Sequence, residues 1–480
     1  MFTPSIRTDQ AAIDFAAIRA EMGIADEFPE AAIAEARRAA ENGPEAAATS
    51  YPERGDDRDI AFVTIDPPGS KDLDQAVYIE SIGRDAFRVH YAIADVAGFV
   101  IPGGALDAES HRRGMTLYCP DTRVPLYPAE LSEGAASLLP DADRPAVLWT
   151  IDLDERGEPS AARVRRTVIR SRAQLDYTTV QAQADVGDLH PSIALLPRVG
   201  RLRLQSARRR HAINLDLPES EVVRGVDGRW TLVRRGILPV EQYNAQVSLL
   251  TGMCAARIML DGRVGILRTL PPPNAGQITA LRRETAALGI PWPDDIPPGD
   301  VVSRLDAARP RHAAFIEDAI RLLRGAGYTT FDGDLPAQTL HGGLGAAYAH
   351  VTAPLRRLVD RFATEICLSL QAGAAPPQWA LAALTELPGE MEAANRRSKE
   401  LDRASTQVVS EFLLAERVGD VLTGVAVQVD EVRGRATILL DEPPVRVHAP
   451  ADGLVEGSRA AVRLTAVDRA AHRVDVEVIS

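Results

Sequence analysis

The chain has 480 residues, of which 45% are hydrophobic and 25% are charged, which is the composition of a soluble globular protein with several domains. Its formal net charge of −13 excludes a protein that binds nucleic acid over a uniformly basic surface, although a basic channel inside an acidic shell stays open. No apolar run approaches the roughly 20 residues of a membrane-spanning helix, and no secretory signal opens the sequence.

Residues 1–55 predict a short helical segment followed by a linker. Residues 10–22 and 29–41 are rich in alanine and favour helices, and a glycine follows each of them. Residues 41–59 are polar and rich in glycine, proline and charge, which is typical of a linker.

Residues 56–418 predict an α+β domain, because strands come first in the chain and helices follow. One helix, at 106–113, lies among the strands, and a hairpin at 221–234 interrupts the helices, with V-D-G-R as its turn. The expected strands are 60–66, 75–80, 86–94, 146–153 and 161–171, and the expected helices are 239–260, 273–288, 310–325, 355–372 and 386–417.

Residues 419–480 return to period-two patterning, and five short strands separated by Gly and Asp turns predict an OB-type β-barrel. Such barrels are common modules for single-stranded nucleic acid. No aromatic Phe, Tyr or Trp follows Phe412, so nothing is available to stack on bases. RNA contact and a purely capping role therefore stay equally open for this barrel.

The stretch with the clearest chemistry is residues 64–76, T-I-D-P-P-G-S-K-D-L-D-Q-A, at the end of the first expected strand. Asp66, Asp72 and Asp74 crowd three carboxylates onto one loop, which is unfavourable unless a cation shares them or water screens them. Oxygen ligands without Cys or His suit Mg²⁺ or Mn²⁺. From these residues alone, a metal site and a solvated acidic loop both stay open.

Four further stretches decide between these two interpretations. They read V-H-Y-A-I-A-D-V-A-G-F-V (89–100), L-D-A-E-S-H-R-R-G-M-T-L-Y-C-P-D (106–121), V-P-L-Y-P-A-E-L-S-E-G-A-A-S-L-L-P (124–140) and H-G-G-L-G-A-A-Y-A-H-V-T-A-P-L-R-R (341–357). Taken in this order after the Asp loop, they resemble the RNB catalytic domain of the ribonuclease II and ribonuclease R exoribonucleases.

The resemblance covers roughly residues 56–415 and implies the RNB fold, a β-sheet core wrapped by helices. It also implies Mg²⁺-dependent hydrolysis of single-stranded RNA from the 3′ end, with release of nucleoside 5′-monophosphates. Family members usually carry two OB barrels before the catalytic domain. Because 55 residues cannot hold even one comfortably, we expect this chain to lack them.

Residue by residue, the resemblance makes Asp66, Asp72 and Asp74 the acidic metal positions. Gln75 stands where the family usually has a fourth acid, and it offers a carbonyl oxygen as ligand but no charge. Asp74 is also expected among the catalytic residues.

Three further side chains are expected to meet the RNA. Tyr118 matches a tyrosine that packs against the RNA 3′ end, and Tyr177 matches an aromatic that stacks on bases at the channel mouth. Arg356 matches an arginine that contacts the scissile phosphate, where a guanidinium can hold two oxygens and offset developing charge. The expected catalytic group is therefore Asp74, Tyr118 and Arg356.

Other positions leave alternatives open. Ala245 and Gln246 replace a Glu-Glu pair that faces the terminal nucleotide in the family, and Glu241, one helical turn earlier, could stand in. Residues 163–172 and 198–211 are rich in arginine and could either line an RNA path or form solvated faces balanced by the excess of acids.

The sequence thus predicts a cytoplasmic exoribonuclease that uses Mg²⁺, with Mn²⁺ as a substitute, and acts as a monomer on single-stranded RNA. The three cysteines, far apart in the sequence, favour a reducing compartment, and no membrane or protein partner is indicated. Two alternatives are an RNA-binding protein of the same fold with impaired catalysis and a phosphodiesterase specialised for short oligoribonucleotides or one RNA class.

Overall fold

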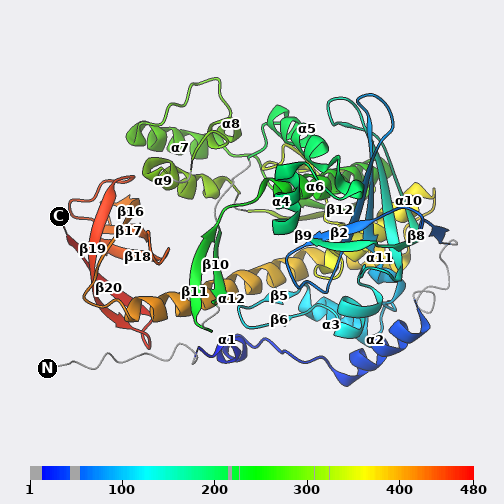
Figure 1. The fold of residues 1–480 in the computed structure, drawn as a ribbon, viewed down its shortest axis with the longest axis horizontal. Helices are drawn as coiled ribbons and strands as arrows, with labels where there is room; N and C mark the ends of the chain where they lie inside the picture. Colours follow the sequence, from blue (N-terminus) through cyan, green and yellow to red (C-terminus); the bar gives the residue numbers. More distant parts are fainter. Residues whose placement is uncertain are drawn as a thin grey trace.

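A seven-stranded β-sheet forms the centre of the larger part of the molecule (Figure 1). The computed structural model describes residues 13–43, 54–213, 219–225, 228–306, 309–323 and 325–479. The strand order is β1-β8-β7-β4-β3-β2-β9, and all pairs are antiparallel except β1–β8 and β2–β9. The strands are β1 Gly55–Asp56, β2 Val63–Asp66, β3 Gln75–Ser81, β4 Phe87–Ala94, β7 Asp143–Leu153, β8 Pro159–Arg170 and β9 Ala173–Asp176.

Helices surround this sheet and bury its central strands. Helices α6 and α10 pack against each other and against β8, so that β4 and β7 are buried along most of their length. Their apolar, β-branched sequences suit such a position. The helices are α1 Phe15–Glu21, α2 Glu30–Asn42, α3 Ala105–Arg113, α4 Tyr177–Val186, α5 Leu196–Arg209, α6 Pro239–Gly262, α7 Ala275–Leu288, α8 Pro298–Val302, α9 Pro310–Ala319, α10 Leu358–Gln371, α11 Gln378–Ala383 and α12 Leu387–Ala415.

Four short antiparallel pairs join these layers. The pair β5–β6 and the pair β10–β11 are hairpins that flank α12 (Figure 1). The members of the four pairs are β5 Leu117–Tyr118 with β6 Arg123–Val124, β10 Glu219–Arg224 with β11 Trp230–Arg235, β12 Val264–Thr269 with β13 Gly327–Asp332, and β14 Leu340–His341 with β15 Ala346–Ala347.

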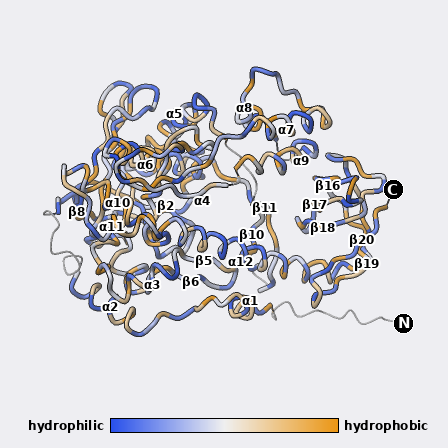
Figure 2. Tube along the Cα trace, turned by 180° about the vertical axis from the view of Figure 1, so that it is seen from behind, coloured by the Kyte–Doolittle hydropathy of each residue, from blue (hydrophilic) through white to orange (hydrophobic). Residues whose placement is uncertain are grey.

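Helix α12 runs from the sheet region to a separate C-terminal β-barrel (Figure 1). The barrel is nearly closed, with strand order β18-β17-β16-β19-β20. Buried and exposed residues alternate along β18, and Figure 2 shows the matching alternation of hydropathy around the barrel. Its strands are β16 Val421–Asp430, β17 Arg435–Leu440, β18 Arg446–Pro450, β19 Arg459–Asp468 and β20 Arg473–Ile479.

The N-terminal helix α1 contacts several elements on the barrel side of the molecule. The ring of Phe15 packs edge-on against Trp230 of β11 at 5.1 Å, and both residues belong to the barrel's hydrophobic core. On the same helix, the buried Arg19 binds Asp26 at 3.1 Å and Asp121, in the β5–β6 turn, at 2.8 Å. Helix α1 therefore contacts both hairpins that flank α12.

The structure confirms the α+β class, the C-terminal barrel and the expected strands and helices, with ends shifted by a few residues. Helix α10 begins at Leu358 and not at residue 355 as predicted, because Met115 pairs with Arg357 as a β-bridge and holds it out of the helix. Residues 1–12 and 44–53 of the predicted N-terminal helix and linker, and part of the 226–229 turn, lie outside the described residues.

The arginine-rich segments became β8 and α5, and acids balance most of their charge. Arg166 of β8 is buried against Asp95 at 2.9 Å. Arg203 of α5 is 1% exposed, donates to the Gly157 carbonyl at 2.7 Å and pairs with Glu158 at 3.1 Å. These two arginines are paired with acids, as the second alternative expected, but they are buried and do not form a solvated face.

In the described part of the chain, no helix combines the length and the apolar character that crossing a bilayer requires.

We expect Phe15→Ala to loosen α1, because the loss of a buried phenylalanine costs about 3 kcal/mol. Hydrogen exchange should be faster at the backbone amides of residues 15–24, while the β-sheet amides keep their rates. Val186→Ala, at a position that is 78% exposed, is the control. Unchanged exchange in α1 would contradict the packing role of Phe15.

Candidate active site

The site forms where the acidic loop meets the segment that precedes α10. Asp66 ends β2, and Asp74 lies immediately before β3. The buried Asp74 accepts a hydrogen bond from the Leu355 amide at 2.8 Å through Oδ1, and its Oδ2 lies 3.4 Å from Nε of Arg356. Two segments that are far apart in the sequence are thus joined at one carboxylate.

Burial dominates the electrostatics of the loop. It raises the pKa of Asp66 to about 7, although the Arg356 guanidinium pulls it down. Burial also raises the pKa of Asp74 to about 8, against Arg356 and the Leu355 amide. Asp72 adds repulsion to both carboxylates. Arg356 alone therefore does not offset the free-energy cost of keeping both carboxylates charged at this site.

Asp72 is paired with an arginine other than Arg356. Arg123 of β6 forms an ion pair with Asp72 and, through its other terminal nitrogen, binds Glu133 at 2.5 Å. Arg123 stands directly opposite Tyr118 in the β5–β6 register, so this bridge connects the hairpin to the acidic loop.

The donor set fits a hard divalent cation. Oδ2 of Asp66 is buried and has no hydrogen-bond partner, and Asp74 presents a second carboxylate beside Arg356. Mg²⁺ typically takes one or two protein carboxylates and fills its remaining positions with water and phosphate oxygens. Within the described ranges, no three Asp, Glu, His or Cys side chains converge as a complete protein cage. The residues present therefore suit a cation that shares its coordination with a substrate phosphate.

The Gln75 side chain is hydrogen-bonded to protein groups at both ends of its amide. Its Nε2 donates to the Thr352 carbonyl at 2.6 Å, and its Oε1 accepts from the hydroxyl of Tyr91 and from Ser248 at 3.2 Å. Both ends of the amide are thus occupied by protein groups. The expected role of Gln75 as a metal ligand stays a prediction.

The segment that carries Arg356 is fixed at several points. Oδ1 of Asp360, which is fully buried, accepts from the Ala353 amide at 2.7 Å, and Asp360 also pairs with Arg357 at 2.9 Å. The Arg356 carbonyl accepts from the Thr116 amide at 3.0 Å. The Arg356 side chain nevertheless stays 46% exposed, so an anion from the solvent can reach it.

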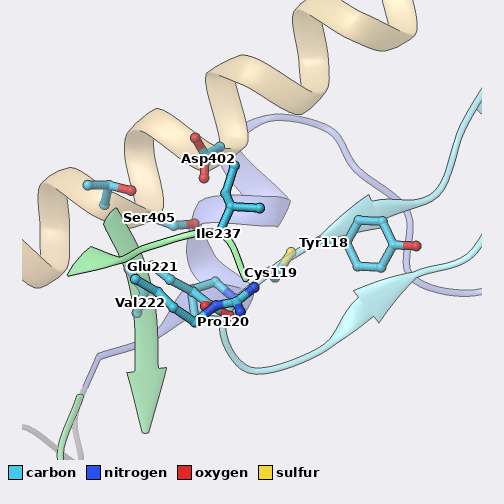
Figure 3. A pocket seen from close by; sticks show the side chains of 10 residues that line it. Tyr118, Cys119, Pro120, Glu221, Val222, Ile237, Asp402 and Ser405 are labelled. Atoms are coloured by element: carbon cyan, nitrogen blue, oxygen red, sulfur yellow. The ribbon is translucent and has the colours of Figure 1, made fainter. Parts of the chain in front are cut away.

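Tyr118 lies beside this group and borders a hollow of about 330 Å³. It is 54% exposed and lies within electrostatic reach of Arg356, Asp72 and Asp74. Figure 3 shows Asp402 and Ser405 of α12 on one side of the hollow and strand β10 across from them, with the Tyr118 ring turned away from the other lining residues. Tyr118 thus stands between the acidic site and this hollow.

Tyr177 lies on another side of the site, at the start of α4. Its hydroxyl accepts from Nδ2 of Asn244 at 3.0 Å, and it lines a second hollow of about 320 Å³ that includes Ala245 and Gln246 of α6. Asp66 and Arg356 lie within electrostatic reach of its hydroxyl. The structure therefore brings Asp66, Asp72, Asp74, Arg356, Tyr118 and Tyr177 around one site.

Glu241 also borders this second hollow, but its carboxylate has local partners. It accepts from the Leu238 amide at 2.8 Å, which caps the start of α6, and it pairs with Arg235 of β11 at 2.8 Å. Capping explains its place in the helix, so the structure does not favour Glu241 as a substitute for the acids missing at 245 and 246.

Comparison with known proteins agrees with this arrangement. Residues 54–367, more than half of the chain, match the RNB domain, and residues 420–479 match the RNase II-type exonuclease C-terminal S1 domain. The chain belongs to the RNB family.

Two curated relatives and one solved structure illustrate the membership. The chain is 31% identical to the exosome complex exonuclease RRP44 homolog A of Arabidopsis thaliana over 65% of this chain and 35% of that protein. It is 27% identical to ribonuclease R of Escherichia coli over 78% of this chain and 48% of that protein. The structure of Mycoplasma genitalium RNase R in complex with ribose-methylated single-stranded RNA aligns with a TM-score of 0.84 and 20% identity, covering 98% of this chain and 78% of the other. The chain thus spans about half the length, or less, of these curated relatives.

Several residues of this RNB site were not identified from the sequence. Tyr91, Ser248 and Asn244 sit on elements whose periodicity marks them only as parts of a strand or a helix. Arg123 alone among them could have been found from the sequence. A hairpin with its turn near Asp121 places this arginine directly opposite Tyr118.

We expect Arg123→Ala to leave Asp72 and Glu133 as unneutralised neighbours, since the cation between them is lost. Added MgCl₂ should then raise the melting temperature of the variant more than that of the unaltered protein. Arg198→Ala removes an exposed ion pair with Asp85 and serves as the control. Equal responses to MgCl₂ in all three proteins would argue against the bridge.

Proposed function

We propose that this protein is a divalent-metal-dependent exoribonuclease that hydrolyses single-stranded RNA from the 3′ end and releases nucleoside 5′-monophosphates. The observation that carries the proposal is the convergence, in an RNB-family chain, of the partly buried Asp66 and the buried Asp74 with the half-exposed Arg356. Buried carboxylates beside an accessible guanidinium suit a cation and a phosphate bound together.

Asp66 and Asp74 would hold the cation, Mg²⁺ or Mn²⁺, with Asp72 adding negative charge at the rim. A bound cation supplies charge neutralisation at the phosphate and lowers the pKa of a coordinated water. The unpartnered Oδ2 of Asp66 supports this role, because a buried carboxylate oxygen without a donor is otherwise costly.

Arg356 would bind the scissile phosphate. Its backbone is fixed by the hydrogen bonds at Thr116, Leu355 and Ala353, and its guanidinium already lies 3.4 Å from the Asp74 carboxylate. A preorganised cation stabilises negative charge that develops in the transition state without reorganisation at the moment of reaction.

Tyr118 and Tyr177 would hold the RNA end on two sides of the acidic group. Stacking of an aromatic ring on a base contributes about 1–3 kcal/mol and depends little on base identity. This accounts for binding that is independent of sequence, as an exonuclease requires.

We also propose that the protein works as a monomer in a reducing compartment such as the cytoplasm. Cys119, Cys254 and Cys367 form no disulfide bond, and Cys254 and Cys367 are buried. Free thiols of this kind persist where disulfides do not form.

A second candidate function is RNA binding without turnover, and the observation that favours it is the loss of acids at Gln75 and Ala245. A third is hydrolysis restricted to short oligoribonucleotides or one RNA class. Incubation of the protein with 5′-labelled single-stranded RNA, in Mg²⁺ or in EDTA, separates the three. Shortening of long RNA only in Mg²⁺ supports the first, binding without cleavage supports the second, and cleavage of short substrates alone supports the third.

We predict that Asp74→Asn lowers turnover by about a hundredfold to a thousandfold, the scale observed when a group that stabilises the transition state electrostatically is removed. The amide oxygen can still accept from Leu355, so melting temperature and RNA affinity should be preserved. Asp188→Asn, on an exposed turn, is the control. Wild-type turnover in Asp74→Asn would remove this residue from the reaction.

We predict that Arg356→Lys lowers kcat by about tenfold or more while the Kd for RNA changes less than threefold, because lysine keeps the charge but loses the bidentate fork. Single-turnover kinetics and filter binding measure the two quantities separately. Arg201→Lys, an exposed position on α5, is the matched control. Equal losses in rate and affinity would assign Arg356 to ground-state binding.

A further inference from the structure

The Gln75 side chain joins three separate parts of the fold. It leaves the start of β3, reaches Tyr91 on the adjacent strand β4, Ser248 on α6 and the Thr352 carbonyl in the segment before α10. Tyr91 and Thr352 are 1% and 3% exposed, so water does not compete freely for these bonds.

The chemistry of these three partners requires an amide. A backbone carbonyl can only accept, so the group that faces Thr352 must be a donor, which fixes the orientation of the Gln75 amide. Tyr91 can donate its one hydroxyl proton to Oε1, and Ser248 can donate its own either to Oε1 or to the Tyr91 oxygen, which lies 2.7 Å away. An ionised carboxylate of the same length has no donor for Thr352 and would place two oxygens against each other.

The segment that Gln75 holds is the one that carries Arg356. Gln75 donates to the Thr352 carbonyl, and its neighbour Asp74 accepts from the Leu355 amide. Two consecutive residues thus bind both ends of the segment from residue 352 to residue 355. Asp360 holds the Ala353 amide from the other side. These hydrogen bonds fix the backbone from which the Arg356 side chain extends toward the Asp74 carboxylate, 3.4 Å away.

We propose that Gln75 is a positioning residue that holds Arg356 in place relative to Asp66 and Asp74, and that Gln75 does not itself ligate the cation. The inference rests on the proposed function for its kinetic consequences and deepens it, because the cation's protein ligands are then Asp66 and Asp74. An acid at position 75 would impair this chain and would not complete its metal site.

The test compares Gln75→Glu with Gln174→Glu. The control introduces the same charge and removes the same kind of bond, from an exposed Nε2 to the Ser70 carbonyl at 2.7 Å in the same acidic loop. Gln75→Glu should lower kcat between about tenfold and a hundredfold, as expected when a reacting group is displaced. The Kd for RNA and the Mg²⁺ concentration for half-maximal activity should stay within twofold of wild type. The control should match the wild type in all three.

A gain in Mg²⁺ affinity in Gln75→Glu, or turnover equal to wild type, would overturn the proposal in favour of a ligand role or no role. Tyr91→Phe gives a second route, because it removes a hydroxyl that touches Gln75 and adds no charge. It should also lower kcat with unchanged Mg²⁺ dependence. Wild-type turnover in Tyr91→Phe would count against the positioning role even if Gln75→Glu fails to fold.

Hydrogen exchange measured without metal or RNA separates this proposal from the proposed function. The amides of Leu355, Arg356 and Arg357 should exchange about tenfold faster in Gln75→Glu and at wild-type rates in Gln174→Glu. If the unaltered protein does not cleave RNA, the proposed function fails, and this comparison still decides whether Gln75 fixes the segment. Unchanged exchange in Gln75→Glu overturns the positioning role.

Discussion

The buried carboxylate of Asp74 is the constraint around which the site is arranged. It accepts from the Leu355 amide and faces the Arg356 guanidinium, so it joins the acidic loop to a segment nearly three hundred positions later in the chain. Burial makes this charge costly, and the Arg356 guanidinium and the Leu355 amide offset part of that cost, while Asp72 and Asp360 add to it. The same cost makes the pair Asp66 and Asp74 suited to a cation that arrives with substrate.

The rest of the fold serves to hold that junction. The β-sheet supplies the ends of β2 and β3 for the acidic residues, and the Arg356 segment leads directly into α10, which packs against α6 and β8. The β5–β6 hairpin brings Tyr118 and Arg123 alongside, and Arg19 of the N-terminal helix α1 holds its turn through Asp121. A site on rigid elements keeps its geometry before substrate binds, which electrostatic stabilisation requires.

Two positions that usually carry acids in the family, 75 and the pair 245 and 246, lack them here, and the structure shows what the nearby polar side chains do instead. Gln75 has both ends of its amide in use, and Glu241 is committed to a helix cap and to Arg235. In this arrangement both side chains are engaged by other protein groups. The proposed enzyme therefore relies on two carboxylates and one guanidinium, and on the hydrogen bonds that fix their separation.

The sequence by itself determined the α+β order and the barrel, because alternation and helical periods are local properties, and its resemblance to the RNB family pointed to the candidate residues Asp66, Asp74 and Arg356. It could not determine that helix α10 begins after Arg357, that Arg166 and Arg203 are buried, or that Tyr91 and Ser248 meet Gln75. These facts depend on contacts between segments distant in sequence, and a polar side chain has no local signature of its partner. Only the tertiary structure decided which atoms satisfy each buried donor and acceptor.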